Sequence, residues 1–298
     1  MQAEAIREAN ARYHDLAAVH YDTKWGISYG GVGRKQVLGK LRKAIGSDEH
    51  FGRVLEVGAG TGYFTLNLLL AGAVDEAVAT DISPGMLAKL SGSAERLGVD
   101  VKTVRCEATE LPFPDESFDL VFGHAVLHHL PDLMAAFREF RRVLRPGGRV
   151  AFCGEPSLYG DRLAELPKCG ARAVAPLWRA LVRAAPRAAN GSAYESEEDE
   201  LERVVDVHAF TPAELERQAR AAGFEAVRVR GEELAASLFG WANRSLEATA
   251  DPDQVPWAWR QYAHRGYLAL QALDRGLLEP RLPAALFYNL LVAARVTG

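Results

Sequence analysis

Val54-Leu-Glu-Val-Gly-Ala-Gly-Thr-Gly-Tyr-Phe-Thr65 joins a mostly apolar tetrapeptide with one acid, three alternating glycines and the start of a helical pattern. The run 54–57 predicts a short buried strand, and residues 63–70 carry apolar side chains at helical spacing. Strand, glycine turn and helix in this order hold a nucleotide-like ligand close to the backbone of an α/β sheet. The stretch therefore predicts an α/β fold with a ligand site at the turn.

The spacing of the glycines decides between two ligands. A dinucleotide site needs Gly-x-Gly-x-x-Gly, and Tyr63 stands where the last glycine should be. Glu56 precedes the turn, and its carboxylate would repel a pyrophosphate but suits a ligand with an ammonium or sulfonium group. The turn therefore favours S-adenosylmethionine (SAM) over NAD. A turn that merely joins a strand to a helix is the alternative.

A second acid follows the turn at a useful distance. Residues 77–80 predict a second strand that ends at Asp81. An acid about 20 residues beyond the glycines can accept hydrogen bonds from ribose hydroxyls. A solvated loop acid is the alternative. Ser83 as N-cap and Pro84 at the first helical position predict the start of a helix.

Several motifs together make the chain similar to class I SAM-dependent methyltransferases, and most of all to the quinone-biosynthesis C-methyltransferases. They are the glycine turn, Asp81, Leu111-Pro-Phe-Pro-Asp-Glu-Ser-Phe-Asp119, Val126-Leu-His-His-Leu130 and Arg142-Val-Leu-Arg-Pro-Gly-Gly148. The resemblance covers residues 53–153. It implies a doubly wound, seven-stranded, mostly parallel sheet (a Rossmann-like methyltransferase fold) with SAM as cofactor.

The resemblance also implies which residues bind SAM. Those around the methionine part are Glu56, Gly58, Ala59, Gly60 and Gly62. Those around the adenosine are Asp81 at the ribose, Ile82 and Met86 on the adenine face, and Glu107 and Ala108 at the adenine edge. The family usually has Asp where this chain has Glu107.

Candidates for acid–base chemistry follow the fourth and fifth strands. His124 and His128 can act as bases because histidine titrates near neutrality, and Glu155 is a further candidate. The resemblance also implies that His124 lies at the cofactor, where it faces the transferred methyl group. A backbone-bonded histidine and a helix-start carboxylate are the alternatives. Tyr21 stands in a family-like Ala-x-x-Tyr-Asp context, and its ring can face a sulfonium, so we expect it at the cofactor and the reacting groups.

Composition narrows the function. A net charge of −4 argues against nucleic-acid binding, which rests on Lys and Arg neutralising phosphates. The three cysteines are widely spaced without Cys-x-x-Cys, and the chain starts without an apolar signal core, so a cytoplasmic protein is expected. No apolar run is long enough to span a bilayer, and no metal site is expected.

The segments outside the resemblance predict a lid and a cap. We expect residues 1–48 to form an N-terminal helical lid and residues 49–298 the SAM-binding domain. Within that domain, insertions 155–210 and 231–286 leave the sheet near its ligand edge, so an acceptor-binding cap is expected. A dimer face or an enlarged core is the alternative. The first insertion is basic and amphipathic, which is compatible with peripheral membrane contact or a solvated face.

These patterns predict a methyltransferase that acts on an oxygen or carbon atom of a small, largely apolar acceptor. N-methylation of an amine or a lipid head group is one alternative. A non-catalytic SAM-binding protein is another, although the intact cofactor motifs argue against it. A nicotinamide oxidoreductase is a third, against which the glycine spacing argues.

Overall fold

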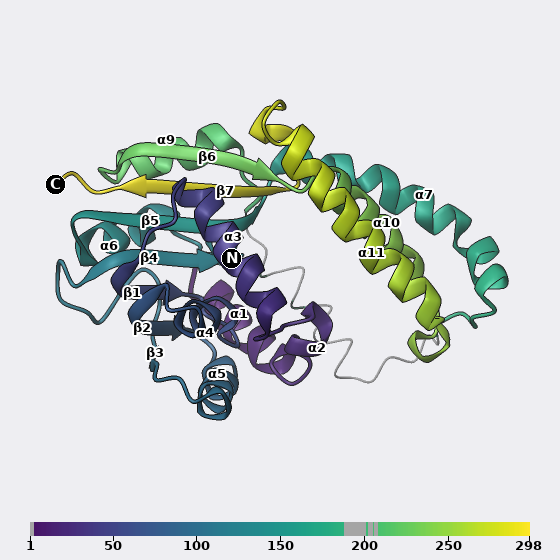
Figure 1. The fold of residues 1–298 in the computed structure, drawn as a ribbon, viewed down its shortest axis with the longest axis horizontal. Coiled ribbons are helices and arrows are strands. Elements are labelled where there is room, and N and C mark those ends of the chain that lie inside the picture. Colours follow the sequence, from purple (N-terminus) through teal and green to yellow (C-terminus); the bar gives the residue numbers. More distant parts are fainter. Residues whose placement is uncertain (1–2, 188–200, 202–204, 206–207) are drawn as a thin grey trace.

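The structure of the protein, a computed structural model, describes residues 3–187, 201, 205 and 208–298 (Figure 1). Its centre is a seven-stranded sheet of order β3-β2-β1-β4-β5-β7-β6. The strands are β1 (Phe51–Val57), β2 (Val74–Asp81), β3 (Lys102–Arg105), β4 (Phe118–His124), β5 (Leu144–Pro156), β6 (Glu225–Glu232) and β7 (Asn289–Arg295). Strands β1 to β5 pair in parallel, and β7 runs antiparallel to both β5 and β6. The predicted mostly parallel, seven-stranded sheet is confirmed.

Helices cover both faces of the sheet because successive side chains of a buried strand point to opposite faces. Val54 of β1 packs with α3 (Gly31–Ile45) and α4 (Tyr63–Leu70). Its neighbour Leu55 packs on the other side with α6 (Leu133–Val143) and α9 (Pro212–Ala221). Helix α5 (Pro84–Leu97) adds Leu90 to the core near β2. The sheet is therefore doubly wound.

The helix-start signals in the sequence are confirmed by the hydrogen bonds of the caps. The side chains of Ser83, Asp132 and Thr211 accept hydrogen bonds from the amides of Met86, Ala135 and Glu214. Helix α6 ends at Val143, before Pro146, Gly147 and Gly148. Strand β5 begins at the next residue because the chain there already pairs with Phe118 of β4.

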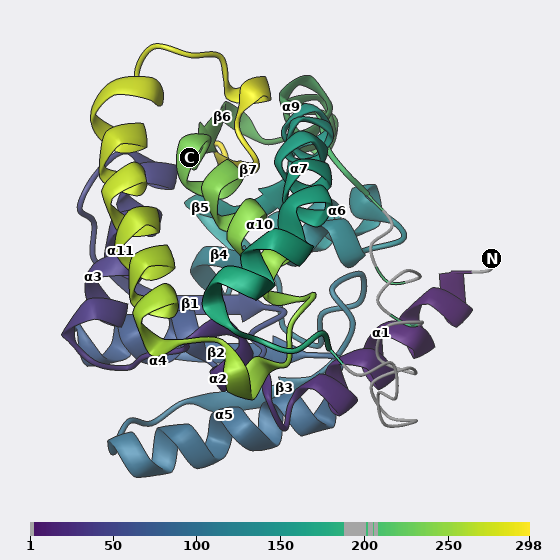
Figure 2. The same ribbon diagram turned by 90° about the vertical axis from the view of Figure 1, so that its right-hand side faces the viewer.

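The N-terminal segment divides into two parts. Helices α1 (Ala3–Ala17) and α2 (Tyr21–Trp25) lie beside the carboxyl ends of the strands, and α1 contacts α5 (Figure 2). Asp15 of α1 binds the hydroxyl of Ser83 and the amide of Gly85 at the start of α5. Helix α3 instead belongs to the core of the sheet, where Val37 is fully buried.

The two insertions form a helical bundle that projects from the carboxyl end of the sheet (Figure 1). Helix α10 (Ala235–Glu247) packs against both α7 (Leu158–Val182) and α11 (Trp257–Leu273). Short helical turns complete the fold: η1 (Leu127–His129), η2 (Pro252–Gln254), η3 (Asp274–Leu278) and η4 (Ala284–Leu286). No helix among the described residues is long and apolar enough to cross a membrane.

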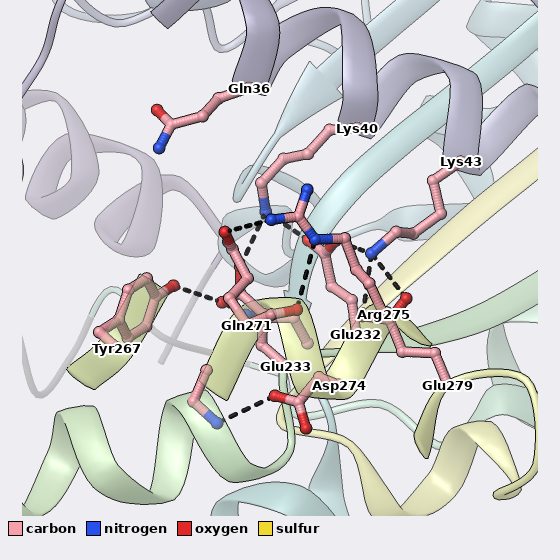
Figure 3. A network of polar contacts seen from close by, with 12 residues as sticks. Gln36, Lys40, Lys43, Glu232, Glu233, Tyr267, Gln271, Asp274, Arg275 and Glu279 are labelled. Atoms are coloured by element: carbon pink, nitrogen blue, oxygen red, sulfur yellow. Dashed lines mark hydrogen bonds and ion pairs between the residues drawn. The ribbon is translucent and has the colours of Figure 1, made fainter. Parts of the chain in front are cut away.

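A buried ion cluster ties α3 to the end of β6 and to the second insertion (Figure 3). Lys40 pairs with Glu232, and Lys43 lies 2.9 Å from Glu232 and 2.8 Å from Glu279. Burial by itself raises the pKa of Glu232, but the two ammonium groups outweigh it and hold that pKa at about 2. Next to them, Glu233 accepts a hydrogen bond of 2.8 Å from the Tyr267 hydroxyl.

Candidate functional site

A cavity of about 360 Å³ lies at the carboxyl ends of β1, β2 and β4. Ligands of open α/β sheets bind at this edge, because the connections after two neighbouring strands lead to opposite faces of the sheet and leave a crevice between them. Predicted site residues that line it are Tyr21, Gly58, Gly60, Asp81, Ile82, Met86, Glu107, Ala108 and His124. Glu56, Ala59, Gly62, His128 and Glu155 are not among its lining residues. The structure therefore places most of the predicted site residues around one cavity.

Two glycines of the turn have different tasks. Gly58 has φ 64°, and a Cβ there would lie 2.4 Å from a methyl of Val126, so the turn needs glycine to pack against the loop after β4. Gly60 has φ 53°, and a Cβ there would meet no atom within 4 Å. Because Gly60 also lines the cavity, its missing side chain leaves room for a ligand close to the backbone.

The two acids near the glycine turn, Asp81 and Glu56, differ in whether they line the cavity. Asp81 accepts hydrogen bonds from the amides of Gly60 (2.8 Å) and Ser83 (2.9 Å), and burial raises its pKa. Glu56 lies behind the turn and accepts hydrogen bonds from the amide (3.0 Å) and the hydroxyl of Thr65. Burial raises the pKa of Glu56 to about 8, although both bonds from Thr65 lower it.

Helix α1 covers the cavity with polar side chains that the sequence did not single out. Arg7, Asn10 and His14 follow the i, i+3, i+7 spacing of one helix face, and all three line the cavity. Arg7 binds Glu107, and the Asn10 amide nitrogen donates to the carbonyl of His129 at 3.3 Å. The spacing of these polar residues on one helix face is the signal in the sequence that indicates them.

His124 is held as a neutral imidazole at the wall of the cavity. Its ring stacks on Phe64 with centroids 4.8 Å apart. Burial and, next, the charge of Lys40 lower its pKa to about 3. At neutral pH the uncharged ring can accept a hydrogen bond, which a charged imidazolium cannot, but a pKa this low disfavours uptake of a proton.

His128 and Glu155 form a buried support behind that wall. Glu155 is fully buried and accepts hydrogen bonds from the amides of Val126 (3.0 Å) and Leu127 (3.1 Å). His128 Nδ1 lies 2.8 Å from the same carboxylate. Burial raises the pKa of Glu155, but the bond to His128 and the amides outweigh burial and leave the pKa below its ordinary value. These contacts position the loop after β4, and a catalytic role for either residue stays a prediction.

Tyr21 lies at the cofactor end of the cavity as a neutral phenol. Burial and, next, the charge of Asp81 raise the pKa of Tyr21 to about 12. At neutral pH its hydroxyl is therefore a donor or an acceptor, and proton abstraction by a phenolate is disfavoured. Its catalytic role also stays a prediction.

Neither insertion contributes a described residue to the lining of this cavity. The acceptor-binding cap thus stays a prediction. The acidic run 195–202, which follows the basic helix in the sequence, lies outside the described residues apart from Leu201.

Comparisons with known proteins agree with this geometry. Residues 55–152 match the model of the methyltransferase domain family. A malonyl-[acyl-carrier protein] O-methyltransferase of Methylococcus capsulatus is 34% identical over 228 residues, covering 72% of this chain and 70% of that protein. A demethylmenaquinone methyltransferase of Mycobacterium sp. (strain KMS) is 37% identical over 235 residues, covering 77% and 88%.

The chain is a member of the SAM-dependent methyltransferase family. Solved structures agree on the fold. The phosphoethanolamine N-methyltransferase 2 of Haemonchus contortus, in complex with phosphomonomethylethanolamine and S-adenosylhomocysteine (SAH), has a TM-score of 0.61 at 18% identity. That match covers 98% of this chain and 60% of the other. The putative sarcosine dimethylglycine methyltransferase of Galdieria sulphuraria has a TM-score of 0.56 at 15% identity and covers 94% and 98%.

Proposed function

We propose that this methyltransferase acts on an oxygen or carbon atom of a small, largely apolar acceptor. The observation that carries the proposal is the neutral His124 at the cavity wall. A hydroxyl or carbon acceptor must lose a proton as it is methylated, whereas a carboxylate acceptor is already ionised. A neutral imidazole can accept a hydrogen bond from the hydroxyl or donate one to the carboxylate, and so orient either acceptor. Two relatives of this chain are named for the methylation of malonyl-[acyl-carrier protein] and of demethylmenaquinone.

The cavity suits SAM in shape and polarity. Gly60 leaves the turn open, Asp81 supplies carboxylate oxygens, and Met86 is an apolar surface for a base. When bound, SAM supplies a methyl group on a sulfonium, whose leaving group is a neutral thioether. The task of the chain is then to orient the acceptor and exclude water, and orientation contributes about 7 to 11 kcal/mol.

Charges of both signs lie near His124. The Lys40 ammonium lowers the pKa of His124, and Glu232 and Glu155 raise it. Because burial keeps the ring neutral, His124 orients an acceptor through a hydrogen bond.

Turnover of SAM to SAH tests the proposal with three acceptor classes: a hydroquinone, a carboxylate thioester and a primary amine. We expect turnover with one of the first two. His124→Ala should lower kcat about 100-fold, whereas His124→Gln, which keeps an acceptor oxygen, should lose less. SAH affinity should stay within about threefold in both variants. Turnover of the amine alone, or full activity of His124→Ala, would contradict the proposal.

We also propose that the chain works in the cytoplasm at an anionic membrane surface. Leu166, Val174, Leu177 and Leu181 of α7 are 70%, 52%, 76% and 79% exposed. Residues 158–187 carry six basic and two acidic side chains in a chain of net charge −4. An apolar stripe beside basic residues suits the interface of anionic lipids. The described cysteines are unpaired, as in a reducing compartment.

Sedimentation with vesicles tests this surface. We expect binding to vesicles rich in phosphatidylglycerol, none to phosphatidylcholine, and loss of binding in Leu177→Asp. Val32→Asp is the matched control, because Val32 is 68% exposed on another helix. A concentration-dependent dimer that binds no vesicle would place a second copy of the chain on this stripe and refute the membrane proposal.

A further inference from the structure

Asn10 has an unsatisfied polar atom in the roof of the cofactor cavity. The residue is only 5% exposed and lines the cavity, and its Oδ1 has no hydrogen-bond partner among the described residues. The orientation of the amide follows from its neighbour. The carbonyl of His129 can only accept, so the Asn10 nitrogen must face it and Oδ1 is the remaining atom.

A buried acceptor without a donor is costly, at about 1 to 3 kcal/mol. Such an atom in a ligand cavity indicates a donor on the ligand. SAM offers three kinds of N–H or O–H donor: the adenine amino group, the ribose hydroxyls and the methionine ammonium. The position of Asn10 along α1 decides among them.

Helix α1 crosses the cavity from the adenine end to the ribose end. Arg7 binds Glu107, the expected adenine-edge residue, and Asp15 binds Ser83 and Gly85 beyond the ribose acid. A rise of about 1.5 Å per residue places Asn10 about 4.5 Å from Arg7 and about 7.5 Å from Asp15 along the axis. Asn10 therefore lies on the adenine side of the roof.

The other donors have acceptors elsewhere. Asp81 at the end of β2 lines the cavity and is the expected partner of the ribose hydroxyls. Glu56 of β1, the expected partner of the ammonium, does not line the cavity, but it lies at the turn and not on α1. The adenine amino group has Glu107, but the Arg7 guanidinium already occupies one oxygen of that carboxylate. An acceptor on α1 completes the recognition of this group.

We propose that Asn10 Oδ1 accepts a hydrogen bond from the adenine amino group and thereby selects adenosine cofactors. The inference rests on the methyltransferase function and adds a specificity-determining residue on the lid helix. It also gives α1 a direct reason to close, because the ligand satisfies an atom of the helix that the protein leaves unsatisfied.

Calorimetry with two ligands tests the proposal without turnover: SAH, and a desamino analogue with hydrogen in place of the adenine amino group. We expect the wild type to prefer SAH by at least about fivefold to tenfold, because the analogue loses the bond to Asn10 and any bond to Glu107. Asn10→Ala should bind SAH about fivefold to tenfold more weakly, the size of one hydrogen bond, and the analogue within about twofold of the wild type.

Asp15→Ala is the matched control on the same helix. Asp15 binds only protein groups in the bonds described above, so this variant should weaken both ligands by the same factor. An equal loss for both ligands in Asn10→Ala would show a packing role and overturn the proposal. Loss of the preference in Glu107→Ala, with Asn10→Ala unchanged, would assign the amino group to Glu107. If the wild type binds neither ligand, the cofactor assignment falls as well.

Discussion

Glu56→Gln tests whether the carboxyl beside the glycine turn binds the ammonium group of the cofactor. Glu56 is 2% exposed, and burial raises its pKa to about 8. At pH 7 a carboxyl with that pKa is about 90% protonated. Glu56 does not line the cavity, so the measurement decides whether the cofactor ammonium reaches it. An ammonium beside Glu56 lowers the pKa of the carboxyl, and the proton leaves. We therefore expect SAH binding to release about 0.8 to 0.9 proton at pH 7, and much less at pH 9.

Calorimetry at pH 7 in phosphate and in Tris measures this release, because the two buffers differ in ionisation enthalpy. Glu56→Gln should abolish the release and weaken SAH about tenfold or more, since a bond to a charged group contributes about 1.5 to 3 kcal/mol. The amide oxygen of Gln can still accept from both donors of Thr65, so the fold is kept. Equal proton numbers for the wild type and the variant would refute the reasoning and indicate another group, such as Asp81.

The same raised pKa predicts how stability depends on pH. Folded Glu56 keeps a proton that the unfolded chain releases above pH 4.5. Its contribution to the free energy of unfolding is therefore fully present below pH 4.5 and is lost as pH rises toward about 8. The slope is about 1.4 kcal/mol per pH unit for one proton. In urea unfolding, the free energy of unfolding of Glu56→Gln should rise relative to that of the wild type between pH 5 and 7.5. A difference that stays constant over this range would contradict the reasoning.

Gly60→Ala and Gly72→Ala should each cost about 1 to 2 kcal/mol in urea unfolding, because both sites have positive φ (53° and 62°) and open space for a Cβ. Only Gly60→Ala should weaken SAH in calorimetry, since Gly60 lines the cavity; an equal effect at Gly72 would be evidence against a local cause. Glu155→Gln should destabilise by about 2 kcal/mol at pH 7, because an amide nitrogen replaces the oxygen that accepts from the His128 amide. Because the pKa of Glu155 is lowered, this difference should shrink as pH falls below 4.5, and urea unfolding at pH 7 and pH 4 checks it. Residues 21–31 should gain protection from hydrogen exchange when SAH is added, and unchanged exchange would favour a segment that is packed without ligand.

The sequence determined by itself those features that depend on neighbouring residues. The strand–glycine–helix unit of residues 54–70 and the caps at Ser83 and Asp132 follow from local patterns, because a turn or a cap is satisfied within a few residues. Most of the predicted cofactor residues line one cavity for the same reason. Parallel strands end at one edge, so residues that follow successive strands meet there.

Only the tertiary structure decided which distant groups meet. The pair Lys40–Glu232 joins residues 192 positions apart, and the Lys40 charge lowers the pKa of His124 while the Glu232 charge raises it. The burial of Glu155 and its bonds to the loop after β4 also come from the packing of distant elements, and its catalytic role stays a prediction. Asn10 became part of the cofactor site through the packing of α1 across the cavity. Such contacts depend on burial and on the docking of whole elements, and local sequence patterns carry no record of either.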